Sequence, residues 1–555
     1  MTDFLTWVQK REKFFSAAVC VLIFVLYLPH VLLSDYILRD VAERYAPMAE
    51  SFAAGHFQYA FHPRIQTLHP LISGIFAAVT GCSGFSAAQL SGLLFLGLCS
   101  FPLYYLLKLV FDLKTAVRGT LHLPLISPVV LICISGLRES HKMFTLLLLV
   151  SGILTVFKFR EKYSGYLLTG TGCGLAFCIR NDLVIPALAL MTAAGAMEFA
   201  FSGSCKRSCA GLAVMFPFLF FETIVNYFIS GYAVPGCRFW IFFKEISPAA
   251  ATPEGFMLYI VLPSLVLYFA AITAGGGLLR RQKGRKVLAV CGILLFATLA
   301  VDVVLQSLSV VVTDWQDGMK IFASLIRPVF AGCNLPLFIL ALAGIYCLKK
   351  QNEWNDGQRF LLFLFFFWIT STVFTITAIE RKLYVSDRYL LPASILLTGW
   401  GVRGIGFCAE QLKKYLNRYI VICLSVLLII ACFCHAYSTV LEERFKREKV
   451  IQKQSLKIIT QVIRQNYRGP EYFTPEFSLF QYRGYRRPRI ACMPLGKQAV
   501  SAYRCGGSLV FPNGEPDFII ASAEENFSEK KWRKIAGDLP FGKTYLNVWE
   551  LKEVK

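Results

Sequence analysis

The feature that most limits the fold of this chain is a series of long apolar stretches that recur between its start and about residue 437. Each is about 20 residues long, which is the length that an α-helix needs to cross a bilayer. Hydrophobic residues make up 56% of the 555 residues, and the mean hydropathy is +0.55. A soluble chain of this length would not be so apolar. We therefore predict an all-α polytopic membrane protein.

About 13 transmembrane helices are expected in the first 437 residues. The stretch 70–81 is apolar but short, which is typical of a re-entrant or interfacial segment. The predicted spans cover residues 14–33, 86–107, 119–136, 143–157, 165–180, 183–201, 211–230, 256–275, 287–312, 329–348, 360–379, 389–408 and 419–437.

The distribution of basic residues predicts the orientation of these spans. Lys10, Arg11 and Lys13 precede the first span, and Arg280-Arg281-Gln282-Lys283-Gly284-Arg285-Lys286 fills one loop on the same side. Basic loops stay on the cytoplasmic side of a membrane. We expect a cytoplasmic N-terminus, an uncleaved first helix and, after an odd number of spans, an outer C-terminus in the inner (plasma) membrane.

The chain after residue 438 has a different composition. Short strand-like runs such as 508–511 and 518–520 alternate with Gly and Pro turns. This pattern predicts a small extracytoplasmic α/β domain over residues 438–555, beside a transmembrane domain over residues 1–437. The net charge of +22 is ascribed to membrane topology and contact with membrane lipids, and no nucleic-acid partner is expected.

Two acidic residues in the predicted outer loop 34–85, Asp40 and Glu43, stand three positions apart. On a helix this spacing puts both side chains on one face. A carboxylate is a suitable base for taking a proton from an acceptor hydroxyl or amine, and both residues are candidates. The following segment, from Tyr45 to Phe57, has apolar residues at helical spacing and is predicted to lie in the membrane interface.

Other predicted outer loops hold cations that suit a phosphate, arginine in particular because it binds phosphate in a bidentate manner. Some of these loops also carry acids or histidines, as in Arg138-Glu139-Ser140-His141-Lys142 and Arg180-Asn181-Asp182. The candidate phosphate ligands are Arg64, Arg138, Lys142, Arg180, Lys382 and Arg388.

Two ionisable residues, Glu222 and Asp302, fall inside predicted spans. Such residues are costly in a bilayer and often functional, so they support the alternative of a secondary transporter or flippase for a lipid or polysaccharide. Hydrogen bonding between helices is the reading that we favour for them. A third alternative is a noncatalytic envelope scaffold whose basic tail binds lipid or glycan.

No nucleotide-binding loop of the Walker A or dinucleotide type is present in the sequence. The outer histidines, His141 among them, lack the tight spacing of a zinc site. We expect no metal and no other cofactor, with a divalent metal as the alternative that the outer acids leave open.

Four stretches carry a family resemblance: Asp40 to Gly55, His69 to Gly84, Gly174 to Asp182, and Asp387 to Pro392. The third ends in Arg-Asn-Asp and the fourth reads Asp-Arg-Tyr-Leu-Leu-Pro. In order and spacing they resemble motifs of the GT-C glycosyltransferases. The similar members are the bacterial relatives of dolichyl-phosphate-mannose protein mannosyltransferases and the aminoarabinose transferases acting on lipid A.

This resemblance implies a polyprenyl-phosphate sugar as donor, a catalytic acid at Asp40, and a site acid of the second outer loop at Glu139. Two departures stand out. The family often has adjacent acids four and three residues before the tyrosine, whereas Asp40 and Glu43 stand five and two residues before Tyr45, so the choice of base stays open. His69 replaces the first proline of a Pro-Pro-Leu motif, so acceptor contacts should differ.

These observations predict an integral membrane glycosyltransferase of GT-C-like fold, with an extracytoplasmic lipid, glycan or protein as acceptor and inversion at the transferred sugar. Asp40 or Glu43 would be the catalytic base. The donor phosphate would be bound by Arg138, Arg180, Arg388, Lys382 and Arg64, and the rest of the site would hold Tyr45, Glu139, His141, Asp182 and His69.

Overall fold

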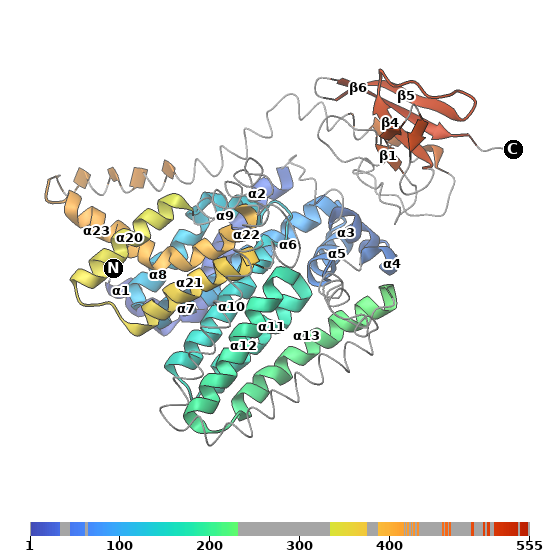
Figure 1. Ribbon diagram of the computed structural model, residues 1–555. Helices are drawn as coiled ribbons and strands as arrows, with labels where there is room; N and C mark the ends of the chain where they lie inside the picture. Colours follow the sequence, from blue (N-terminus) through green and yellow to red (C-terminus); the bar gives the residue numbers. More distant parts are fainter. Residues whose placement is uncertain are drawn as a thin grey trace, which may run out of the picture.

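A computed structural model gives the structure of the protein (Figure 1). It describes residues 2–33, 41, 45–61, 65–230, 334–374, 387–415, 417, 419–420, 423–424, 426–427, 430–431, 455, 458–459, 461–463, 465–467, 490–492, 503–505, 508–510, 516–541 and 544–552.

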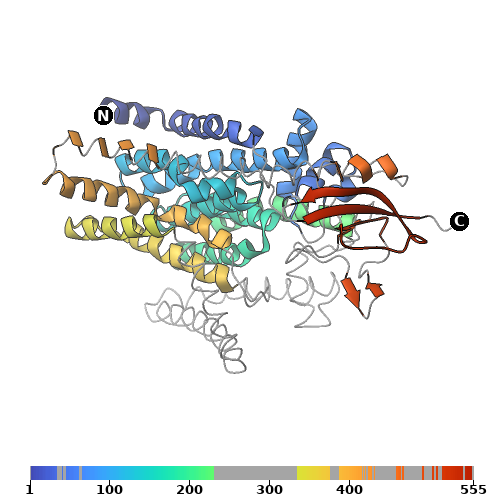
Figure 2. The same ribbon diagram turned by 90° about the horizontal axis from the view of Figure 1, so that it is seen from above.

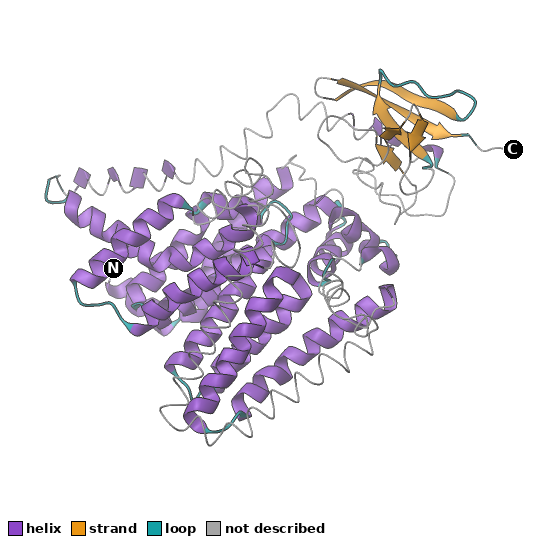
Figure 3. Cartoon of the chain, in the orientation of Figure 1, coloured by secondary structure: helices purple, strands orange, loops and turns teal. Residues whose placement is uncertain are grey.

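The described part of the first 437 residues is helical (Figure 3). Up to residue 133, the helices are α1 (Thr2–Lys10), α2 (Glu12–Leu33), α3 (Ala46–Ala53), α4 (Phe57–Ala60), α5 (Leu68–Thr80), α6 (Gly84–Leu98), α7 (Ser100–Val110), α8 (Leu113–His122), the 3-10 turn η2 (Leu123–Leu125) and α9 (Ser127–Cys133). They are followed by α10 (Glu139–Lys158), α11 (Tyr163–Ile179), α12 (Asn181–Ser202), α13 (Lys206–Ser230), α20 (Leu335–Lys350), α21 (Asp356–Phe374), α22 (Asp387–Leu390), η6 (Leu391–Leu397) and α23 (Thr398–Leu412).

Helices able to cross a membrane are present, so the prediction of a multi-pass membrane protein is confirmed. Within the described residues, six helical segments are long and apolar enough: Glu12–Leu32, Gly84–Val110, Glu139–Lys158, Asp182–Ser202, Lys206–Val225 and Arg388–Leu412. The short helix predicted over 70–81 is α5. The count of 13 stays a prediction, because spans 256–275 and 287–312, and most of 419–437, lie outside the described residues.

One predicted span is not a continuous helix. The chain over residues 119–136 forms the end of α8, the turn η2 and then α9. Pro124 and Pro128 stand at the starts of η2 and α9, where proline is tolerated but a preceding helix must end. The break leaves the carbonyl oxygen of Pro124 to accept a hydrogen bond from the buried Tyr27 hydroxyl of α2, at 2.6 Å.

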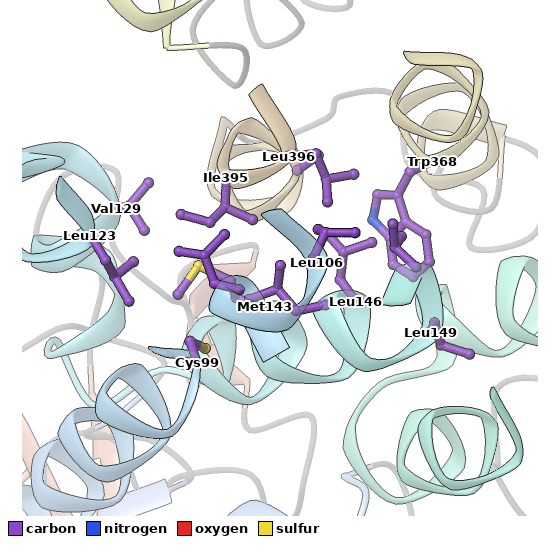
Figure 4. Close-up of a cluster of buried hydrophobic side chains, with 14 of the residues drawn as sticks. Cys99, Leu106, Leu123, Val129, Met143, Leu146, Leu149, Trp368, Ile395 and Leu396 are labelled. Carbon is purple, nitrogen blue, oxygen red and sulfur yellow. The ribbon is translucent and has the colours of Figure 1, made fainter. Parts of the chain in front are cut away.

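The helix α10 lies at the centre of this bundle. It packs against α6, α7, α11, α12, α21 and η6, and the views along two directions agree with this arrangement (Figures 1 and 2). Figure 4 shows Met143, Leu146 and Leu149 of α10 among side chains of neighbouring elements, including Leu106 of α7 and Trp368 of α21. Because both ends of α10 are fixed by these neighbours, the polar residues in its first turn have a defined position.

The C-terminal strands confirm the predicted α/β domain. The strands are β1 (Ile490–Cys492), β2 (Tyr503–Cys505), β3 (Ser508–Val510), β4 (Phe518–Ser522), β5 (Trp532–Phe541) and β6 (Thr544–Leu551). Their order in the larger sheet is β1-β4-β6-β5, with β1 parallel to β4 and the other pairs antiparallel, while β2 and β3 form a separate hairpin.

The two faces of the central strand β4 differ in what covers them. Phe518 and Ile520 face the helical residues Ile459 and Ile463. The alternate residues of β4 pack with Trp532 and Trp549, as the two-residue period of a strand requires. The strand predicted over 518–520 is confirmed, and the boundary at residue 438 stays a prediction.

Small residues let α20 and α23 pack closely. A methyl group at Gly404 of α23 would collide with the backbone oxygen of Leu340, and Gly344 of α20 meets the backbone of Trp400 in the same way. By contrast, a methyl group at Gly406, also in α23, would meet nothing within 4 Å. Close backbone approach through small residues is the usual way for membrane helices to associate.

We expect Gly404→Leu to lower the free energy of unfolding by about 1–3 kcal/mol, since overpacking forces the two backbones apart. Thermal unfolding of the detergent-solubilised protein, followed by tryptophan fluorescence, measures the effect. Gly406→Leu is the matched control and should leave the melting temperature close to that of the wild type. Equal effects of the two substitutions would contradict this packing.

Candidate active site

The first outer loop is anchored beside the start of α10 by a small apolar cluster. Val41 is fully buried, and a methyl group at Gly136 would lie 3.1 Å from its Cγ1 atom. Gly136 has a φ of +83°, which favours glycine. Val41 is therefore held against the turn that leads to Arg138. Asp40 and Glu43 lie outside the described residues.

Buried ion pairs join the first turn of α10 to the α11–α12 junction. The Nζ atom of Lys142 lies 2.6 Å from Asp182 Oδ2, and Arg180 Nε lies 2.7 Å from Asp182 Oδ1. The Nη1 atom of Arg180 also lies 3.0 Å from Glu139 Oε1. The four side chains are at most 9% exposed. Two carboxylates thus balance two cations in a region shielded from water.

The fourth motif meets this network through Tyr389. Lys142 Nζ donates a hydrogen bond to the Tyr389 carbonyl oxygen at 2.8 Å. The guanidinium groups of Arg180 and Arg388 lie 4.6 and 5.2 Å from the centre of the Tyr389 ring, within the range of a cation–π contact. A tyrosine far along the chain thus contacts cations from two of the predicted loops.

Arg138 differs from Lys142 and Arg180 in what holds it. Its Nη1 atom donates to Gln66 Oε1 at 2.6 Å and to the Ile179 carbonyl oxygen at 2.8 Å, and its guanidinium lies over the Tyr45 ring at 5.4 Å. All three partners are neutral. Within the described part of the chain, no carboxylate lies within salt-bridge distance of Arg138, and its buried Nε has no hydrogen-bond partner. The positive charge of Arg138 is therefore not balanced by any described residue.

Four rings, those of Tyr45, His69, His141 and Phe95, contact one another in succession beside Arg138. The ring centres of Tyr45 and His69 are 4.7 Å apart, those of His69 and His141 4.9 Å, and those of His141 and Phe95 3.9 Å. The His141 Nε2 atom lies 3.0 Å from Ser91 Oγ. Burial, together with the Arg138 guanidinium, lowers the pKa of His69 to about 3. His69 is therefore neutral at physiological pH.

Glu222 of α13 is 1% exposed and is hydrogen-bonded. The backbone N–H and the hydroxyl of Thr67 both donate to its Oε2 atom, at 3.2 and 2.5 Å. The hydrogen bonding that the sequence led us to expect for this residue is present, between α13 and the residue before α5. Asp302 lies outside the described residues.

The structure brings together eight of the site residues named from the sequence: Tyr45, His69, Arg138, Glu139, His141, Arg180, Asp182 and Arg388. Arg64 and Lys382, like Asp40 and Glu43, lie outside the described residues. Their roles, like those of the eight, stay predictions.

Three residues of this region were not predicted as members of the site: Gln66, Thr67 and Tyr389. Neutral side chains and backbone atoms carry no charge pattern in a sequence. Lys142 was named among the loop cations, and its spacing of three from Glu139 was the available signal that it faces the same network.

Among the described residues, no group of three or more His, Cys, Asp or Glu side chains is placed to hold a metal ion. The expectation that the protein needs no cofactor stays a prediction, because the first outer loop contributes acids that are not described.

No family model and no curated protein matches the sequence. Among solved structures, the chain is similar to an oligosaccharyltransferase, AglB, from Archaeoglobus fulgidus, in complex with an inhibitory peptide and a dolichol-phosphate. The identity is 13% and the TM-score 0.47, over 85% of this chain and 61% of that one. The match thus spans about three fifths of the archaeal protein.

The chain is also similar to ArnT from Cupriavidus metallidurans bound to undecaprenyl phosphate, at 12% identity and a TM-score of 0.40, over 95% of this chain and 96% of that one.

We expect Asp182→Asn to lower the free energy of unfolding by about 3–5 kcal/mol, because it leaves Lys142 and Arg180 with an uncompensated buried charge. Chemical or thermal unfolding in detergent measures the loss. Asp356→Asn is the control, since Asp356 pairs with Arg359 at the surface and its side chain is 78% exposed. A loss no larger than that of the control would contradict a buried network.

Acidification should destabilise the protein through His69. The pKa of His69 is near 3 in the folded state and near 6.5 in the unfolded state. At a pH between these two values, the histidine binds a proton only when the protein unfolds. The stability of the folded state therefore falls as the pH falls from about 6.5. Between pH 7 and pH 5 this contribution is about 2 kcal/mol. The melting temperature of His69→Gln should therefore fall less over this range than that of the wild type. Parallel pH profiles would refute the assignment.

Proposed function

We propose that the protein is a membrane glycosyltransferase that moves a sugar from a polyprenyl-phosphate donor to an extracytoplasmic acceptor. The sequence motifs suggest this activity, and the contacts among residues of all four motif stretches support it. Tyr45 and His69 represent the first two stretches. Arg180 and Tyr389 represent the others, at 4.6 Å from each other. A scaffold would not need these separate stretches to meet around one group of charges.

The observation that carries the proposal is the positive charge of Arg138, which no described residue balances. Among the described residues, the groups that hold this guanidinium are all neutral. Leaving a partly buried cation without a counter-charge is costly unless an anion binds to it. A phosphate is such an anion, and charge-assisted hydrogen bonds from arginine suit it.

In the proposed reaction, the carboxylate of Asp40 or Glu43 takes the proton from the acceptor hydroxyl or amine. The acceptor atom then attacks the anomeric carbon of the sugar, and the bond from that carbon to the phosphate oxygen breaks. The phosphate leaves with the electron pair, and Arg138 stabilises its increased negative charge. Direct displacement inverts the anomeric centre.

The other candidate cations divide into two groups. Arg180 and Lys142 are paired with Glu139 and Asp182, so we assign them to holding the site together. Arg388 lies against the same Tyr389 ring as Arg180 and is proposed to extend the phosphate site.

The test is transfer of radiolabelled sugar by the purified protein from a panel of polyprenyl-phosphate sugars to envelope acceptors. Removing the base should lower kcat by about 10²–10⁴-fold, so either Asp40→Asn or Glu43→Gln should do so. Arg138→Gln should raise the KM for the donor. The surface substitution Arg359→Gln is the control. If the protein moved an intact lipid across the membrane and transferred no sugar, the result would contradict the proposed enzyme activity and support a flippase.

A further inference from the structure

Glu222 is an acid within an apolar segment, and the proposed reaction does not use it. The segment Lys206–Val225 of α13 is apolar enough to cross a membrane, yet the carboxylate is 1% exposed. A buried acid in such a helix is expensive and tends to be functional.

Glu222 is hydrogen-bonded to Thr67, the residue that precedes α5. Thr67 does not cap this helix with its hydroxyl. Instead both its hydroxyl and its backbone N–H donate to Glu222 Oε2, at 2.5 and 3.2 Å. Two donors on one oxygen, one of them from the backbone, fix the position of the main chain at Thr67 relative to α13.

Gln66, the residue before Thr67, is hydrogen-bonded to Arg138, the proposed phosphate ligand. Gln66 Oε1 accepts a hydrogen bond from Arg138 Nη1 at 2.6 Å. Gln66 and Thr67 are 4% and 1% exposed, so neither side chain has room to move independently. Because a single peptide bond joins them, the bonds from Thr67 to Glu222 fix the backbone from which the Gln66 side chain extends toward Arg138.

We propose that Glu222 is a positioning residue for the phosphate site, acting through Thr67 and Gln66 on the guanidinium of Arg138. The inference rests on the proposed function, because it assigns Arg138 to the donor phosphate. In this arrangement, an acid within a membrane helix sets the affinity of the site for a polyprenyl phosphate without touching it.

Binding of undecaprenyl phosphate to the full-length purified protein tests this inference. Thr67→Val keeps the shape of the side chain and the backbone N–H but removes the hydroxyl. We expect it to raise Kd by about tenfold, as loss of one charge-assisted hydrogen bond would. Thr67→Ser restores the hydroxyl and should bind as the wild type does. Thr120→Val is the matched control, because Thr120 is equally buried and bonds only within its own helix, to the Ala116 carbonyl oxygen.

A double-mutant cycle separates positioning from general stability. If Thr67 acts through Arg138, the variant with both Thr67→Val and Arg138→Gln should bind no more weakly than Arg138→Gln alone. Glu222→Gln retains an acceptor but loses the charge, and should weaken binding while the melting temperature stays within a few degrees of the wild type.

The outcomes distinguish the positioning role of Glu222 from the proposed phosphate site at Arg138. Weaker binding by Arg138→Gln together with unchanged binding by Thr67→Val and Glu222→Gln would overturn the role of Glu222 and leave the phosphate site in place. Additive effects in the double variant would also overturn it. Unchanged binding by Arg138→Gln would remove the phosphate site itself, and with it the inference.

Discussion

One buried carboxylate, Asp182, accepts ion pairs from Lys142 of α10 and from Arg180 at the start of α12. Arg180 also pairs with Glu139, but without Asp182 the two cations would face a single carboxylate, and the unbalanced charge would be strongly destabilising in surroundings of low dielectric constant. The pairs fix the first turn of α10 against the α11–α12 junction, and Lys142 extends the connection to the Tyr389 carbonyl oxygen. The positions of Arg138, Glu139 and the neighbouring outer loop all follow from where α10 begins.

Much of this architecture could be predicted from the sequence, because the bilayer imposes simple rules. Apolar stretches of the required length predicted the positions of α2, α10, α12 and α13 within several residues, and the short strand-like run 518–520 indicated a strand. The span over 119–136 was wrong as one helix. The sequence contains Pro124 and Pro128 in this span, but an average hydropathy over a window of residues does not indicate where a helix must end.

Which residues lie in the site could be predicted from the sequence more readily than which of them contact each other. Arg138 and Arg180 look alike in sequence, since each follows an apolar stretch and stands one or two residues before an acid. Only the folded neighbours distinguish them: Arg180 meets two carboxylates, whereas Arg138 meets an amide, a carbonyl oxygen and a ring. Contacts of that kind join residues up to about 250 positions apart, as Lys142 and Tyr389 show, and no local pattern encodes them.

The broken helix at Pro124 has a consequence for the order of assembly. The Tyr27 hydroxyl donates to the Pro124 carbonyl oxygen, which is available because the proline turn interrupts the helical hydrogen bonding. In the chain, α2 is made first, so its hydroxyl must enter the bilayer unsatisfied or bound to water. Its partner exists only after η2 has formed. The hydrogen bond that joins α2 to η2 can therefore form only after the chain through residue 125 has been synthesised and has turned.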